Sequence, residues 1–237
     1  MTRFNLIVVL GPTASGKTSL GVKLAQQLNG EIISADSRQV FRGMDIGSGK
    51  DLAEYADVPY HLIDILDAGK EFSVYAFQKL FFQTYDDILN RGKLPLLVGG
   101  TGLYLDSALR GYRMVEVPEN TALRHELAPL SHDQLRTRLI TLRPHLHNST
   151  DLEDRDRLIR AIEIAEGESS AGRNLPDLPD LAPLIFGIRW ERPVQRSRIT
   201  ARLKQRLEAG MIEEVEQLHN SGVSWERLEY YGLEYRF

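Results

Sequence analysis

The sequence of 237 residues contains no cysteine, and several other features are absent from it. Disulfide bonds and thiolate metal sites are therefore excluded, and a reducing compartment, the cytoplasm, is expected. No apolar run approaches the roughly 18 residues that a membrane-spanning helix needs, so no membrane partner is expected. Residues 1–5 lead directly into an apolar run, and we expect no signal peptide before the fold.

An excess of positive charge is also missing. The chain has 29 Lys and Arg against 33 Asp and Glu, which gives a formal net charge of −4. A nucleic-acid partner would therefore have to be met by a local basic surface rather than by the overall field. The hydrophobic content of 42% is ordinary for a globular protein, and the length suits one large domain or one domain with an insertion.

The most informative motif that is present is GPTASGKT at residues 11–18, which fits G-x-x-x-x-G-K-[ST] at every fixed position. An apolar run at 6–10 precedes it and a helical pattern at 18–28 follows it, as in a strand, loop and helix. The glycines allow successive N–H groups to point at one anion, Lys17 adds positive charge, and the Thr18 hydroxyl can hold Mg²⁺. The motif predicts a phosphate-binding loop made of Gly11, Thr13, Ala14, Ser15, Gly16, Lys17 and Thr18.

Apolar runs alternate with helical patterns along the first half, which predicts an α/β fold with a P-loop NTPase-like parallel sheet flanked by helices. Ser73 is a typical N-cap and Gly92 a typical stop for a helix between them. The polar, helix-rich segment 118–160 indicates a small helical insertion, and 167–183 reads as a loop. We expect strands at 31–35, 60–65, 94–98 and 184–188, helices at 193–209 and 211–220, and a core of 1–114 and 154–237 interrupted by an insertion at 115–153.

Polar residues follow two expected strands, and the ends of parallel strands are where ligands bind. Asp36 comes after the second strand, where a carboxylate could ligate Mg²⁺, accept a proton or cap the next helix. Thr101 follows the 94–98 strand, where a polar cradle and a tight turn are both open interpretations. Asp64 could cap a neighbouring segment or help to orient a bound Mg²⁺ ion, and both interpretations stay open. Lys50 could reach a phosphate or lie in solvent.

Taken together, these motifs resemble one family, the tRNA dimethylallyltransferases. The resemblance covers nearly the whole chain and rests on an ordered set that is far more specific than the P-loop alone. The matching motifs are GPTASGKT at 11–18, ISADS at 33–37, RGMDIG at 42–47, HLID at 61–64, FSV at 72–74, VGGTGLY at 98–104, RLIRAIE at 157–163 and RITAR at 198–202.

The resemblance implies an activity and a role for each matching residue. Members transfer a dimethylallyl group from dimethylallyl diphosphate to N6 of the adenine next to the anticodon in tRNA. Asp36 resembles the general base, Thr101 the contact to the target nucleotide, and Lys17, Thr18 and Arg202 the groups that hold the diphosphate and its Mg²⁺. The stretches that resemble tRNA contacts are Asp36, Ser37, Arg38, Gln39, Thr101, Arg124, Asp156, Arg157, Leu158, Ile159 and Arg160, and the insertion resembles the part that clasps the anticodon stem-loop.

The sequence also departs from the family pattern. The insertion is short, and YGLEYR at 231–236 stands where many members have Gly-Tyr-Lys or Gly-Tyr-Arg. Full-length members usually continue with further helices, so we expect these to be absent here and tRNA affinity to be lower. The alternatives are an enzyme that prenylates free AMP, ADP or ATP, a P-loop kinase for a small molecule, and a binding module without catalysis. The basic insertion favours tRNA, and we expect a monomer.

Overall fold

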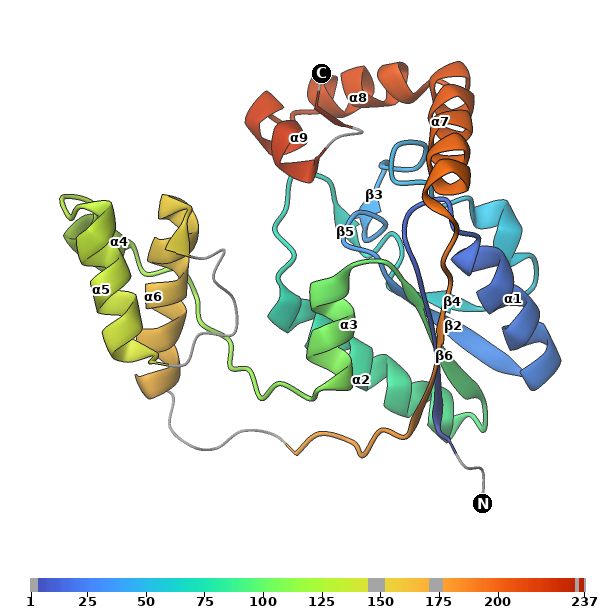
Figure 1. The fold of residues 1–237 in the computed structure, drawn as a ribbon, viewed down its shortest axis with the longest axis horizontal. Coiled ribbons are helices and arrows are strands. Elements are labelled where there is room, and N and C mark those ends of the chain that lie inside the picture. Colours follow the sequence, from blue (N-terminus) through green and yellow to red (C-terminus); the bar gives the residue numbers. More distant parts are fainter. Residues whose placement is uncertain (1–3, 145–151, 171–176, 233–234, 237) are drawn as a thin grey trace. The chain divides into compact units, whose positions relative to one another are not determined.

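The computed structural model describes residues 4–144, 152–170, 177–232 and 235–236. The chain divides into two compact units, one formed by residues Met1–Tyr112 with Leu178–Phe237 and the other by Arg113–Asp177. The first unit carries the sheet and the second is helical in its described part (Figure 1). No helix in the described part of the chain combines the length and the apolar character that crossing a membrane requires.

A five-stranded sheet forms the centre of the first unit, in the order β4-β2-β6-β1-β7. All of its neighbouring strands pair in parallel, so the expected α/β fold class is confirmed. The interior strands are apolar without alternation because helices cover both faces of the sheet. The strands are β1 (Leu6–Leu10), β2 (Gly30–Ala35), β4 (Tyr60–His61), β6 (Leu94–Gly99) and β7 (Pro183–Gly187).

Helices pack on the two faces of this sheet in separate cores. Helix α1 (Lys17–Leu28) places Val22 and Ala25 on the face that carries Ile7 and Val9. Helices α2 (Val74–Asn90) and α3 (Gly102–Leu109) cover the other face with an aromatic core. The expected N-cap of α2 is confirmed, because the Ser73 hydroxyl accepts a hydrogen bond from the Ala76 N–H at 3.1 Å.

The expected strand at 60–65 is wrong beyond its second residue. Strand β4 ends at His61, because Leu62 and Asp64 adopt left-handed φ angles of 61° and 54° that no strand can accommodate. The chain turns there into a separate two-stranded parallel sheet, formed by β3 (Phe41–Arg42) and β5 (Leu66–Asp67). A 3₁₀ helix, η1 (Leu52–Tyr55), lies between these strands in the sequence.

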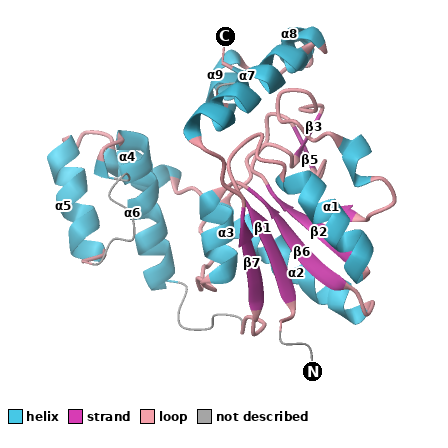
Figure 2. Cartoon of the chain, turned by 45° about the vertical axis from the view of Figure 1, so that its right-hand side comes forward, coloured by secondary structure: helices cyan, strands magenta, loops and turns pink. Residues whose placement is uncertain are grey.

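Three helices end the first unit: α7 (Arg192–Glu208), α8 (Met211–Asn220) and α9 (Trp225–Tyr231). They lie beyond the carboxyl ends of the sheet strands (Figure 2). As expected, Gly210 separates α7 from α8, with a φ of 98° that favours glycine. Helices α8 and α9 pack through Val215, Leu228 and neighbours on Phe41 and Met44, so the C-terminal helices cover the loop that precedes β4.

The second unit contains α4 (Thr121–Leu127), α5 (His132–Leu142) and α6 (Arg155–Ser170). Its core joins Leu135 and Leu139 of α5 with Leu158 and Ile162 of α6. This packing places α6 in the insertion, which reaches Asp177 rather than the expected boundary at 153. Helix α6 also replaces the start of the loop expected at 167–183, of which residues 171–176 lie outside the described part.

Candidate functional site

The loop after β1 has the backbone of an anion cradle. Ala14 and Gly16 adopt left-handed φ angles of 59° and 93°, and α1 begins at Lys17. Such alternation of backbone conformations turns amide N–H groups toward a common point, and the helix start adds partial positive charge. The Lys17 ammonium is tied back to this loop through the Pro12 carbonyl at 3.2 Å.

A cavity of about 210 Å³ adjoins the loop. Lys17 and Thr18 line it from α1, Asp36 lines it from the end of β2, and Thr101 lines it from the end of β6. The structure therefore brings together Asp36 and Thr101, which the sequence places at the carboxyl ends of two parallel strands, with the phosphate-binding loop. Gly100 permits this approach, because a Cβ there would lie 3.0 Å from the Gly11 carbonyl and 3.5 Å from the Lys17 Nζ.

The segment after β2 is fixed to Thr101 by hydrogen bonds. The Thr101 hydroxyl accepts from the Ser37 N–H at 3.0 Å, and the Thr101 N–H donates to the Ala35 carbonyl at 3.1 Å. Asp36 accepts the Arg38 N–H on Oδ1 at 2.9 Å. This contact leaves Oδ2 without a hydrogen bond from any described residue, so the carboxylate keeps an oxygen that can take a proton.

Positive charge is concentrated at the cavity. Burial lowers the pKa of the Lys17 ammonium, Asp36 acts against this, and Arg202 and Arg206 lower the pKa further. A cation whose pKa is lowered by burial and by other cations gains more from an anionic ligand than an exposed lysine does. The site therefore favours a group with several negative charges.

The two arginines come from successive turns of α7 and are already hydrogen-bonded to the loop at 47–51. Arg202 forms an ion pair with Asp51 and donates to the Gly49 carbonyl at 3.3 Å. Arg206 donates to the Gly47 carbonyl at 2.9 Å. Both side chains line the cavity with Lys17, so their guanidinium groups are held close to the expected phosphate position.

A buried carboxylate that the sequence did not reveal holds this loop. Glu214 of α8 accepts the N–H groups of Asp45, Ile46 and Gly47 at 2.8, 2.6 and 3.0 Å. The Tyr235 hydroxyl donates to the same carboxylate at 3.0 Å and accepts the Ser48 N–H at 2.9 Å. The contacts of Glu214 and Tyr235 with this loop cross more than 160 residues and leave no local sequence signal, so pattern reasoning could not find them.

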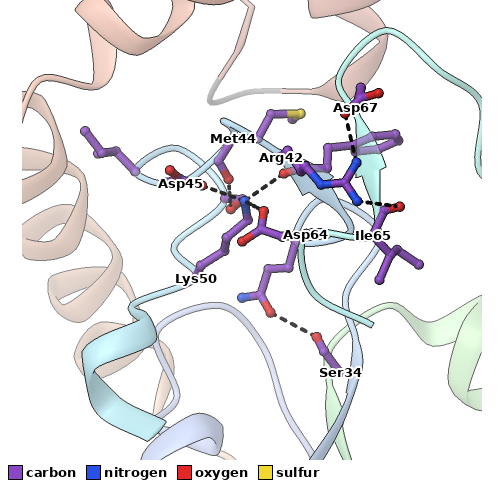
Figure 3. Close-up of polar contacts among 12 residues, drawn as sticks. Ser34, Arg42, Met44, Asp45, Lys50, Asp64, Ile65 and Asp67 are labelled. Atoms are coloured by element: carbon purple, nitrogen blue, oxygen red, sulfur yellow. Dashed lines mark hydrogen bonds and ion pairs between the residues drawn. The ribbon is translucent and has the colours of Figure 1, made fainter. Parts of the chain in front are cut away.

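Lys50 occupies a position that neither sequence interpretation described. Its side chain is only 1% exposed, and Nζ donates to the Phe41 carbonyl at 2.7 Å and to Asp45 at 2.6 Å (Figure 3). Asp64 completes the set as a third partner of Nζ. Lys50 is therefore not a solvent-exposed loop lysine, and Asp45 and Asp64 neutralise its charge.

Two other expected tRNA contacts near the cavity, Arg38 and Gln39, already have hydrogen-bond partners within the protein. Arg38 donates to the Tyr230 carbonyl at 3.3 Å and also bonds the Tyr231 carbonyl, with its guanidinium beside both rings. Gln39 is buried and binds Ser34 at 2.9 Å and the Gly49 carbonyl at 3.1 Å. Gln39 thus connects β2 to the loop at 47–51, although it also lines the cavity.

In the insertion, two of the expected tRNA contacts, Arg124 and Arg160, form ion pairs with a protein carboxylate. Glu163 has a fully buried side chain and accepts Arg124 Nε at 2.8 Å and Arg160 Nη1 at 3.1 Å. Burial raises the pKa of Glu163, but hydrogen bonds from Arg124, the Asn120 N–H and Arg160 outweigh it and lower the pKa overall. Arg124 and Arg160 therefore stabilise the insertion from within.

The remaining expected tRNA contacts lie on two faces of helix α6, one packed on the core of the insertion and one exposed. The Leu158 side chain is fully buried in the core of the insertion, so the expectation that it contacts tRNA is corrected. Ile159 is half-buried against the same core, whereas Asp156 and Arg157 are exposed. Among the expected residues of this helix, Arg157 is the exposed cation.

Comparison with known proteins places the chain among tRNA-modifying enzymes. The sequence model of the family described as IPP transferase matches residues 39–237, and that described as isopentenyl transferase matches residues 4–57. The chain is 67% identical to tRNA dimethylallyltransferase 2 of Syntrophotalea carbinolica, over 98% of this chain and 78% of that protein. It is 66% identical to tRNA dimethylallyltransferase 1 of Geotalea uraniireducens, over 98% of this chain and 77% of the relative.

Solved structures agree with this relationship. The full-length tRNA isopentenylpyrophosphate transferase of Bacillus halodurans is 37% identical, with a TM-score of 0.64 over 92% of this chain and 71% of that one. A eukaryotic dimethylallyltransferase acting on tRNA is 24% identical, with a TM-score of 0.76 over 94% of this chain and 59% of that one, and this likeness concerns the fold.

Proposed function

The chain belongs to the IPP transferase family. Because its relatives are tRNA dimethylallyltransferases, we propose that it is one as well. In the proposed reaction a dimethylallyl group moves from dimethylallyl diphosphate to N6 of the adenine 3′-adjacent to the anticodon. The observation that supports it best is the single cavity lined by Lys17, Asp36 and Thr101, where a cation, a carboxylate and a hydroxyl meet.

The donor side of the reaction uses the phosphate-binding loop. The bond between C1 of the allylic group and the diphosphate oxygen breaks, and negative charge develops on the departing diphosphate. The amides of the loop, the Lys17 ammonium and the Arg202 guanidinium are preorganised to stabilise that charge. Since Lys17 and Arg202 are fixed before substrate binds, little reorganisation is needed when the charge appears.

Magnesium fits the same part of the site. The Thr18 hydroxyl and the Asp36 carboxylate both line the cavity, and oxygen ligands of this kind are those that Mg²⁺ prefers. We assign Thr18 as its protein ligand. A bound Mg²⁺ ion supplies further positive charge for the leaving diphosphate.

The acceptor side depends on Asp36 and Thr101. The N6 amine of adenine is a weak nucleophile, because its lone pair is delocalised into the ring. As the new N–C bond forms, Oδ2 of Asp36 takes the proton that N6 loses, which general-base catalysis requires. Thr101 orients the base, and the adenine leaves its stack to enter the cavity, at lower cost from a single-stranded loop.

The insertion is proposed to bind the anticodon stem-loop through its exposed cations, Arg157 among them. We further propose that the enzyme acts as a monomer. A cytoplasmic location fits the lack of cysteine and the tRNA substrate.

A labelled-donor assay tests the proposal. The protein is incubated with labelled dimethylallyl diphosphate and Mg²⁺, together with an anticodon stem-loop, the same stem-loop with guanine in place of the target adenine, or free AMP. Label should enter the adenine stem-loop alone. Label in AMP alone would identify a free-nucleotide enzyme, and label in no acceptor would contradict the proposed function.

A further inference from the structure

Three side chains that do not line the cavity with Asp36 bind carbonyl groups of the phosphate-binding loop. The indole N–H of Trp190 donates to the Ser15 carbonyl at 3.0 Å, and Nε of Arg198 donates to the Ala14 carbonyl at 2.8 Å. The side-chain amide of Gln195 donates to the Thr13 carbonyl. Three consecutive carbonyl groups of the loop thus each receive one side-chain donor.

These donors come from one short segment: Trp190 lies between β7 and α7, and Gln195 and Arg198 lie in the first two turns of α7. Strand β7 pairs with β1 up to Leu10 and Gly187, and the Ile188 N–H donates to the Leu10 carbonyl at 2.8 Å. The chain therefore continues beside the loop as both leave the sheet. Trp190 and Arg198 also support each other, because the guanidinium carbon lies 5.0 Å from the centre of the indole ring.

The loop needs such support. Residues 13–15 belong to no helix or strand, and Ala14 holds a left-handed φ of 59° that an L-residue disfavours. In a trans peptide the C=O and the following N–H point in opposite directions. Donors that fix the carbonyls of Thr13, Ala14 and Ser15 therefore also fix the direction of the N–H groups that follow.

We propose that Trp190 and Gln195, with Arg198, form a clasp that holds the loop in its anion-binding conformation. Trp190 and Gln195 are then positioning residues for the diphosphate, since neither is among the residues that line the cavity with Asp36. This inference rests on the proposed function only in taking the bound anion to be a diphosphate. The clasp should affect binding of the prenyl donor, dimethylallyl diphosphate.

The variants Trp190→Phe and Gln195→Leu test the clasp, because each removes one donor and keeps much of the side-chain volume. Loss of one hydrogen bond of ordinary strength corresponds to about a five- to tenfold change in an equilibrium constant. Each variant should weaken binding of inorganic diphosphate by that factor in a calorimetric titration with Mg²⁺ present. The KM for dimethylallyl diphosphate should rise in parallel, while the KM for the stem-loop stays unchanged.

Matched controls are Trp225→Phe and Gln83→Leu. Trp225 is half-exposed and stacks on His219, and Gln83 is exposed on α2. Both should bind diphosphate like the unmodified protein. Because the chain has two tryptophans, Trp225→Phe also leaves Trp190 as the single indole, whose fluorescence should change on addition of diphosphate.

Several outcomes would decide the matter. Unchanged diphosphate affinity in both clasp variants, at unchanged melting temperature, would overturn the clasp even if the unmodified protein transfers the prenyl group. Where Trp190→Phe fails to fold, unchanged diphosphate affinity in Gln195→Leu would overturn the clasp. If the unmodified protein transfers to no acceptor while the clasp variants still lose diphosphate affinity, the proposed function fails and the clasp stands.

Discussion

Replacing Asp36 with asparagine removes a negative charge and a proton acceptor while keeping the local turn. The Oδ1 atom that accepts the Arg38 N–H at 2.9 Å is present in both side chains, so the segment after β2 should keep its conformation. The other oxygen, which carries no hydrogen bond from a described residue, becomes an amide that cannot take a proton from N6. The substitution therefore isolates general-base catalysis from folding.

The expected loss is about 10²- to 10⁴-fold in the rate of transfer, or roughly 3–5 kcal/mol in the activation barrier. A second effect follows from the charge. Asp36 acts against the lowering of the Lys17 pKa by burial, so its removal lowers that pKa further. The protonated lysine is the form that binds diphosphate, and it should thus be lost at a lower pH in Asp36→Asn than in the unmodified enzyme.

Single-turnover transfer to a stem-loop measures the first effect, and the KM for the donor between neutral and alkaline pH measures the second. Asp86→Asn is the control, since Asp86 is an exposed carboxylate on α2. Transfer within a few-fold of the unmodified rate, with diphosphate binding intact, would refute the assignment of Asp36 as the base.

Three further predictions concern binding and stability. Lys17→Ala and Arg202→Ala should each weaken inorganic diphosphate binding by about ten- to a hundredfold in a titration, because each removes a charge-assisted contact. Arg157→Gln should reduce the salt slope of stem-loop binding by about one unit, as expected for one lost phosphate contact. The hydrogen bond from Arg91 lowers the pKa of Glu31. The contribution of this pair to the free energy of unfolding is therefore complete above the ordinary glutamate pKa of about 4.3 and declines as pH falls toward the folded pKa. This decline should be absent from the acid denaturation profile of Glu31→Gln.

Each of these has a clear contrary result. Unchanged affinity in both cation variants would move the diphosphate away from the cavity. An unchanged salt slope in Arg157→Gln would show that its helix face lies in solvent rather than against tRNA. The acid denaturation profiles of Glu31→Gln and the unmodified protein are compared between about pH 3 and 6, a range that brackets the ordinary glutamate pKa of about 4.3. Parallel profiles would show that the pair of Glu31 and Arg91 adds no pH-dependent stability.

The parts of the fold that could be predicted from sequence are those with local causes. The phosphate-binding loop depends on a motif of neighbouring residues, 11–18. The parallel strands show as apolar runs because helices cover both faces of the sheet. Asp36 and Thr101 were found because strand ends in a parallel sheet meet at one edge. Their functional roles came from the family resemblance rather than from this geometry.

What could not be predicted depends on contacts between distant segments. Lys50 is buried because Asp45 and Asp64 neutralise it, and nothing in the sequence around it distinguishes it from a solvated lysine. Glu214 looks like any charged residue on a helix until its three N–H partners are known. Strands of two residues such as β3 are too short to give a periodic signal.

The order of the strands has a consequence for synthesis of the protein on the ribosome. Strand β1 is made first, but its two neighbours, β6 and β7, are completed at Gly99 and Gly187. At about 5–20 residues per second, the second edge of β1 stays without its partner for roughly 4–18 s after the first has paired. During this interval the nascent chain presents an apolar strand edge that can pair with another chain. Slow codons in the insertion would lengthen this interval, so codon choice at 113–177 should affect the yield of folded protein more than codon choice after β7.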